Sequence, residues 1–156
     1  MSTAYDRGCV RELSSRIEID ARPERVWSIL TDFNAYPAWN PFITKIEGSL
    51  QPGSRLEVHI APPGGRAMTF KPTVRTVEEN RELAWLGHLL VPGVFDGEHH
   101  FELAPRPSGG TGFTQRERFS GILVSLTSGA LGKTQRGFEQ MNAALKERAE
   151  QNATWA

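Results

Sequence analysis

The residues best placed to do chemistry are three polar side chains on the otherwise apolar faces of two predicted strands: His99, Gln115 and Glu117. Alternate side chains of a strand share a face. The residues that share the two faces with these three are Phe95, Gly97, Phe101, Leu103, Phe113, Phe119 and Gly121. A hairpin centred on Ser108 makes three facing pairs: Leu103 with Phe113, Phe101 with Gln115, and His99 with Glu117.

The β-carbons of His99 and Glu117 are then expected about 5 Å apart. Three interpretations of this pair stay open. The imidazole and the carboxyl can contact a ligand, as a hydrogen-bonding anchor or as an acid and a base. They can form a purely structural pair, because a buried carboxylate without a partner is costly. A register shifted by one residue would instead turn both side chains to solvent.

The elements that must position this pair are visible in the hydrophobic pattern. Residues 13–20 alternate as a half-buried strand, and Pro23 suits the first turn of a helix, with a second short helix after Asp32. Six further strands are expected at 42–48, 55–60, 68–76, 83–87, 95–103 and 113–121. Pro72 predicts a bulge within the third of these. A long amphipathic helix is expected over 125–151, about 40 Å in length.

A curved antiparallel sheet closed by that helix leaves room for a ligand between them, and the side chains facing inward are the candidate lining. Each of them can equally be core. The predicted ligand-binding residues are Trp39, Phe42, Met68, Phe70, Trp85, Phe95, His99, Phe101, Gln115, Glu117, Phe119, Phe138 and Met141. His99 and Glu117 are also the candidate catalytic residues.

The composition excludes several classes of protein. The 156 residues hold 18 basic and 18 acidic side chains, which gives no electrostatic reason to expect nucleic acid as a partner. The single cysteine, Cys9, excludes an internal disulfide. No secretory signal or membrane span is visible, so the cytoplasm is the expected location. Neither a metal-ligand set on one face nor a phosphate-binding glycine loop is recognised, so neither metal nor cofactor is expected.

Several segments together resemble a known superfamily. They are 17–27 (IEIDARPERVW), 36–42 (YPAWNPF), 95–103 (FDGEHHFEL), 117–121 (ERFSG) and 137–146 (GFEQMNAALK). They are similar to helix-grip, START-like proteins, and within these to the bacterial polyketide cyclase/dehydrase-like branch, over about residues 12–150. The resemblance implies an α+β helix-grip fold: a curved seven-stranded antiparallel sheet wrapped around the C-terminal helix, with two short helices after the first strand. It also implies that the corner at Trp39 helps form the cavity mouth, although Trp39 can equally be a packing anchor.

A single domain is therefore expected over 12–151, with flexible tails at 1–11 and 152–156. The expected function is binding of a hydrophobic or amphipathic small molecule, such as a lipid, a quinone or a polyketide-like compound. The alternative is a polyketide aromatase/cyclase or dehydrase that uses the same cavity with acid and base residues. A partner-binding regulatory domain is the third possibility. Both a monomer and a homodimer stay open, and no stable membrane insertion is expected.

Overall fold

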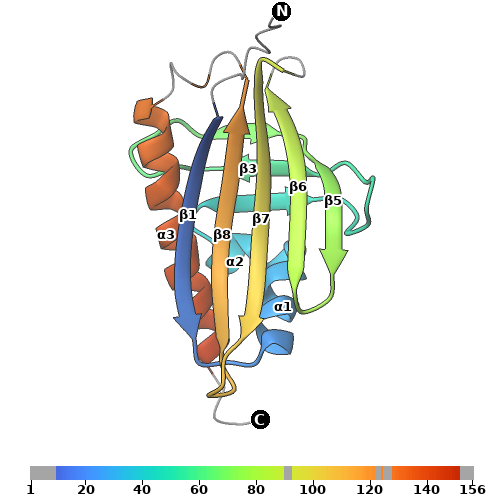
Figure 1. The fold of residues 1–156 in the computed structure, drawn as a ribbon, viewed down its shortest axis with the longest axis vertical. Coiled ribbons are helices and arrows are strands. Elements are labelled where there is room, and N and C mark those ends of the chain that lie inside the picture. The colour runs from blue at the N-terminus through green and yellow to red at the C-terminus, as the bar shows by residue number, and fades with distance from the viewer. Residues whose placement is uncertain (1–9, 90–92, 122–123, 125–127, 152–156) are drawn as a thin grey trace, which may run out of the picture.

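A computed structural model describes residues 10–89, 93–121, 124 and 128–151 of the chain. The structure is α+β, with a long C-terminal helix beside a curved antiparallel sheet (Figure 1). The elements follow in the order β1 (Val10–Ile19), α1 (Pro23–Thr31), a 3₁₀ turn η1 (Phe33–Ala35), α2 (Tyr36–Trp39), β2 (Ile43–Glu47), β3 (Glu57–Ile60), β4 (Met68–Phe70), β5 (Thr73–Glu78), β6 (Glu82–Leu89), β7 (Phe95–Pro105), β8 (Thr111–Ser120) and α3 (Ser128–Glu150). β1 thus begins two residues before the predicted start of the domain.

The expected single seven-stranded sheet is wrong, because the described residues form eight strands in two sheets. One sheet has the order β1-β8-β7-β6-β5 and the other the order β2-β3-β4. The predicted strand 68–76 is in fact two strands that pair with different partners, β4 with β3 and β5 with β6. The break falls at Pro72, which has no backbone N–H to give to a ladder. Its carbonyl instead accepts a hydrogen bond from the N–H of Leu56.

The predicted hairpin register between β7 and β8 is confirmed. His99 pairs with Glu117, Phe101 with Gln115 and Leu103 with Phe113. The period-two pattern sets this register, because a slip by one residue would expose Phe101 and Phe113, which are both completely buried.

Helix α3 runs alongside β1 (Figure 1) and buries one stripe against the sheets. The stripe consists of Phe138, Met141, Leu145 and Ala149, all at 0% exposure. Burial of the three larger side chains stabilises the fold by roughly 1.5–3 kcal/mol each. At Gly137 the helix comes so close to Phe42 that an added β-carbon would lie 2.6 Å from the ring carbon Cε2.

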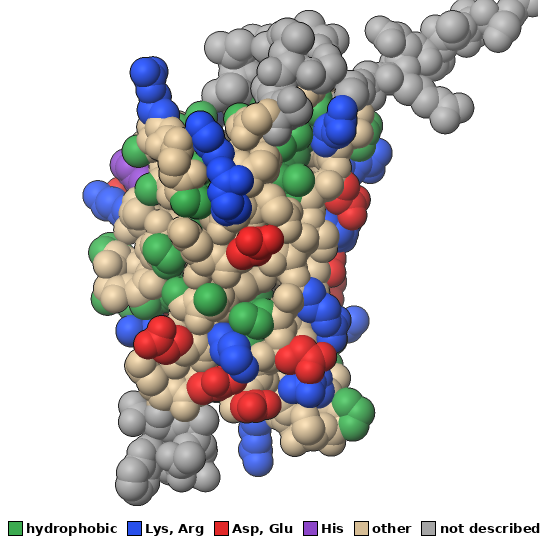
Figure 2. Space-filling model, turned by 90° about the vertical axis from the view of Figure 1, so that its left-hand side faces the viewer, with side chains coloured by type: hydrophobic (Ala, Val, Ile, Leu, Met, Phe, Trp, Pro, Cys, Tyr) green, Lys and Arg blue, Asp and Glu red, His purple; other side chains and the backbone are tan. Residues whose placement is uncertain are grey.

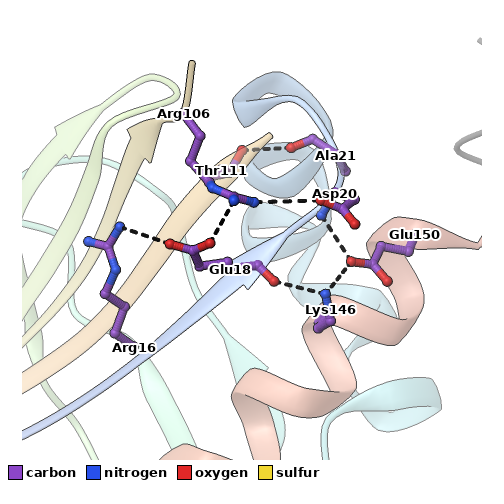
Figure 3. Close-up of polar contacts among 8 residues, drawn as sticks. All are labelled: Arg16, Glu18, Asp20, Ala21, Arg106, Thr111, Lys146 and Glu150. Carbon is purple, nitrogen blue, oxygen red and sulfur yellow. Dashed lines mark hydrogen bonds and ion pairs between the residues drawn. The ribbon is translucent and has the colours of Figure 1, made fainter. Parts of the chain in front are cut away.

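Polar contacts attach the C-terminal half of α3 to the end of β1 (Figure 3). The carboxylate of Glu150 accepts hydrogen bonds from the backbone N–H of Asp20 and from Lys146, which also donates to the carbonyl of Glu18. The Asp20 N–H, followed by Lys146, holds the pKa of Glu150 below its ordinary value. From α1, Arg25 donates to the carbonyls of residues 148, 149 and 151. Two of the last carbonyls of the helix, those of Arg148 and Ala149, thereby gain a partner.

The surface on the α3 side mixes acidic and basic side chains, as the lower part of Figure 2 shows. Several of them pair, including Arg16 with Glu18 at 3.8 Å. Among the described helices, none is both long enough and apolar enough to cross a membrane.

Candidate functional site

An apolar groove opens at one end of the molecule, between the first turns of α3 and the strands. Its volume is about 260 Å³. This space is called the groove from here on. The residues that line it are Ile60, Met68, Phe70, Gly87, His88, Phe95, Gly97, Glu117, Phe119, Ala130, Leu131 and Thr134. Five strands of the two sheets (β3, β4, β6, β7 and β8) and α3 contribute to this lining. The ends of β6, β7 and β8 and the start of α3 lie at the upper end of the molecule in Figure 1. An engineered apolar cavity of about 150 Å³ holds benzene. The groove therefore suits a ligand of about one or two rings.

Two glycines explain why there is space at this point. Gly87 of β6 and Gly97 of β7 are direct partners in the ladder, so two facing side chains are missing from the floor of the groove. A β-carbon at Gly87 would stand 3.4 Å from the ring of Phe70. A β-carbon at Gly97 would stand only 2.7 Å from Oε1 of Glu117. The absence of that carbon lets the Glu117 carboxyl lie across β7 within the groove.

His99 and Glu117 form a close pair at the boundary between groove and core. Nδ1 of His99 lies 3.4 Å from Oε2 of Glu117, and the side chains are 4% and 14% exposed. The imidazole stacks on Phe101 with ring centroids 4.2 Å apart and also packs against Phe138 and Trp85. His99 is therefore held rigidly behind Glu117, and only Glu117 of the two lines the groove.

A chain of buried amides continues from His99 into the core. Nε2 of His99 lies 3.0 Å from Oε1 of Gln115. Nε2 of Gln115 donates to Oδ1 of Asn142 at 2.7 Å, and Nδ2 of Asn142 donates to the carbonyl of Ser15 at 3.2 Å. Gln115 and Asn142 are 0% and 1% exposed. This series, called the relay below, links Glu117 in the groove to β1.

The structure distributes the thirteen predicted site residues over three places. Met68, Phe70, Phe95, Glu117 and Phe119 line the groove. Seven others are packed in the interior, which aromatic rings fill along most of its length: Phe42, Trp85, His99, Phe101, Gln115, Phe138 and Met141. Trp39 is partly buried, packs against this core and does not line the groove. The groove thus contains five of the predicted residues, and the middle of the described interior is packed.

Trp39 lines a second, larger cleft of about 430 Å³ between α1, α2 and the end of α3. This cleft is mostly polar, with Arg25, Asp32 and Arg148 in its lining. Arg25 is already bonded to carbonyls at the end of α3, those of Arg148 and Ala149. None of the described residues that line this cleft belongs to β7 or β8, which carry the His99–Glu117 pair, so the groove is the better candidate site.

Sequence reasoning missed several residues of the site. Gly87 and Gly97 carry a signal, because each falls on the inward face of a strand where a large apolar side chain is usual. That the two glycines face each other can be recognised only when the register between β6 and β7 is known. Asn142 gave no signal of its own. It is 127 residues from its partner Ser15.

A set of potential metal ligands, which the sequence did not reveal, lies outside the groove. Suitable atoms of Glu82, His100 and Glu102 all lie within 4.8 Å of one another. The ring nitrogens of His100 already contact Glu82 and Glu98, at 2.5 and 2.7 Å, and Arg116 bonds Glu102 at 2.6 Å. A cation would have to displace these partners, so the set is explained as an ion-pair cluster.

Comparisons with known proteins agree with this architecture. The Zhui aromatase/cyclase of Streptomyces sp. R1128 superposes with a TM-score of 0.75 at 15% identity, over 92% of this chain and 96% of that one. A START superfamily protein from Mycobacterium smegmatis gives a TM-score of 0.67 at 24% identity, over 90% and 97%. At these identities the likeness shows the fold alone. No curated protein matches the chain.

The family assignment comes from the sequence itself. A sequence model of the family described as "Polyketide cyclase / dehydrase and lipid transport" matches residues 11–150. This match spans nearly all of the described fold, from β1 to the last residue of α3. The polyketide cyclase/dehydrase-like assignment expected from the sequence is confirmed, and the fold is the START-like, helix-grip fold of these solved structures. The chain belongs to the polyketide cyclase/dehydrase and lipid transport family.

Proposed function

We propose that this protein binds a hydrophobic or amphipathic small molecule in the groove between the sheets and the start of α3. The observation that supports this most directly is the groove itself, which combines an apolar lining with one carboxyl group. Ligand sites are typically concave and mostly apolar, with a few polar groups that fix orientation. The floor formed by Gly87 and Gly97 keeps the space open, and both glycines remain part of the β6–β7 ladder.

The test is a titration with prodan, an uncharged two-ring dye whose emission reports on polarity. We expect saturable binding with a shift of the emission to shorter wavelength. Ala130 is exposed and lines the groove, so Ala130→Trp should narrow the groove without disturbing the core. The variant should weaken prodan binding roughly tenfold or more, a loss of about 1.4 kcal/mol.

Ala143→Trp is the matched control. Ala143 is also exposed on α3, but it lies 13 residues further along the helix, about 20 Å from Ala130. The control should bind prodan like the parent protein. Equal affinity in all three proteins would place the dye elsewhere and refute the assignment of the groove. Native mass spectrometry of the purified protein would also reveal any ligand that copurifies.

A polyketide aromatase/cyclase or dehydrase is the second candidate, supported by the position of Glu117. One of its oxygens faces His99 and the other lies over Gly97 within the groove. A bound ketone there could lose a proton from an adjacent carbon to this carboxyl group. A bell-shaped pH–rate profile on a model polyketide, lost in Glu117→Gln, would support this activity. A rate unchanged in Glu117→Gln would exclude Glu117 as the acid or base.

The cytoplasmic location, the absence of a cofactor and the choice between monomer and homodimer stay predictions from the sequence. They form part of the same proposal, in which the only partner required is the small molecule.

A further inference from the structure

The relay has a definite direction, which its Ser15 end determines. The carbonyl of Ser15 can only accept a hydrogen bond, so the side-chain N–H₂ of Asn142 must face it. Oδ1 of Asn142 then faces Gln115 and accepts from its Nε2. The same nitrogen lies 3.4 Å from a second acceptor, the carbonyl of Phe138. Both amide orientations are therefore fixed.

The tautomer of His99 follows from that direction. With Nε2 of Gln115 committed to donation, its Oε1 is the atom that faces Nε2 of His99, at 3.0 Å. An amide oxygen only accepts, so Nε2 of His99 must carry a hydrogen. The second ring nitrogen, Nδ1, is the one that faces Glu117. Because His99, Gln115 and Asn142 are at most 3% exposed, water has little access to this arrangement.

The close approach of Glu117 to Nδ1 of His99 favours one proton held between the two groups. A bare Nδ1 and an ionised carboxylate would direct lone pairs at each other across 3.4 Å. One proton between them removes the conflict, either as imidazolium with carboxylate or as neutral imidazole with carboxylic acid. In both forms the proton lies between Nδ1 and Oε2. Oε1 of Glu117, the oxygen above Gly97, therefore faces the groove as a hydrogen-bond acceptor.

The rest of the groove lining that the structure describes contains no lysine or arginine that could offer a ligand a positive charge. Its other titratable residue, His88, pairs with Asp96 at 2.7 Å. A ligand carboxylate would meet the acceptor oxygen of Glu117 without a cation to offset the repulsion. A hydroxyl group could instead donate to it.

We infer that the groove selects uncharged ligands of one or two rings that carry a hydrogen-bond donor, and rejects their carboxylate analogues. Gln115 and Asn142 are positioning residues in this selection, because they hold the proton on Nε2 of His99. The inference rests on the proposed function, since it names the ligand chemistry of the same groove.

Three naphthalene probes that differ in one substituent test the selection at neutral pH, each by displacement of prodan. 2-Naphthol carries a donor, 2-methoxynaphthalene carries only an acceptor, and 2-naphthoate is an anion. We expect 2-naphthol to bind roughly tenfold more tightly than the ether, the ratio that one hydrogen bond gives. The naphthoate should bind more weakly than the ether. In Glu117→Gln the preference for naphthol should shrink and the naphthoate should gain affinity.

Two further outcomes separate the selection from the proposed function. If all three probes bind equally, the groove is a ligand site but the selection is refuted. If none binds and prodan is not bound either, the proposed function fails, and this inference fails with it.

The relay is tested separately by the ¹⁵N NMR signals of the His99 ring. Nε2 should carry a hydrogen in the parent protein and in Glu117→Gln, and should lose this preference in Gln115→Leu. A proton on Nδ1 with a bare Nε2 in the parent protein would overturn the assignment.

Discussion

Replacing Gln115 by leucine should destabilise the fold far more than its small change in shape suggests. The side chain is completely buried and joins Nε2 of His99 to Oδ1 of Asn142. Leucine fills similar space but leaves both atoms without a partner. Each buried orphan costs about 1–3 kcal/mol, so the variant should lose about 2–6 kcal/mol. This is a large part of the roughly 5–15 kcal/mol that stabilises a typical domain.

Urea unfolding followed by tryptophan fluorescence measures this loss. With a slope of about 2 kcal/mol per molar urea, the midpoint should fall by about 1–3 M while the slope stays unchanged. Gln140→Leu is the matched control, because Gln140 is exposed on α3. The control should stay within about 0.5 kcal/mol of the parent protein.

A double variant distinguishes the loss of the relay from a general packing defect. Gln115→Leu alone leaves Oδ1 of Asn142 without its donor, and adding Asn142→Leu removes that unpaired acceptor. The double variant should therefore cost less than the sum of the two single ones, by about 1 kcal/mol or more. Additive costs, or a loss below about 0.5 kcal/mol for Gln115→Leu alone, would refute the account of the relay given above.

Two further predictions concern α3. Gly137→Ala should destabilise by about 1–3 kcal/mol despite the better helix propensity of alanine, because its β-carbon would overlap the ring of Phe42. Gly132→Ala, at an exposed position of the same helix, should instead stabilise by up to about 1 kcal/mol, and thermal unfolding of the two variants should show the opposite signs. Glu150→Gln should lower stability at neutral pH by less than about 1 kcal/mol, since Glu150 bonds the N–H of Asp20 and is partly exposed. Folding lowers the pKa of Glu150 from its ordinary 4.5. The difference in unfolding free energy between the parent and Glu150→Gln should therefore be complete above pH 4.5 and should disappear as the pH falls through the lower pKa of the folded state. A difference that persists in strong acid would contradict this origin.

The pattern of side chains by itself determined the order of the elements and the register that matters most. Period-two alternation in 95–103 and 113–121 predicted the faces, and a hairpin centred on Ser108 predicted that His99 lies opposite Glu117. Helical spacing likewise identified Phe138, Met141 and Leu145 as the buried stripe of α3. These features depend on local geometry, which repeats every two or 3.6 residues and can be followed along the chain.

Tertiary structure decided where the interior is full and where it is open. The sequence places Phe101 and Phe119 on inward faces alike, yet Phe101 is sealed in the core while Phe119 lines the groove. The difference arises from the missing side chains at Gly87 and Gly97, whose effect depends on β6 and β7 lying side by side. Periodicity tells which way a side chain points. Whether anything fills the space in front of it depends on the volumes of groups from distant segments, which meet only when the chain has folded.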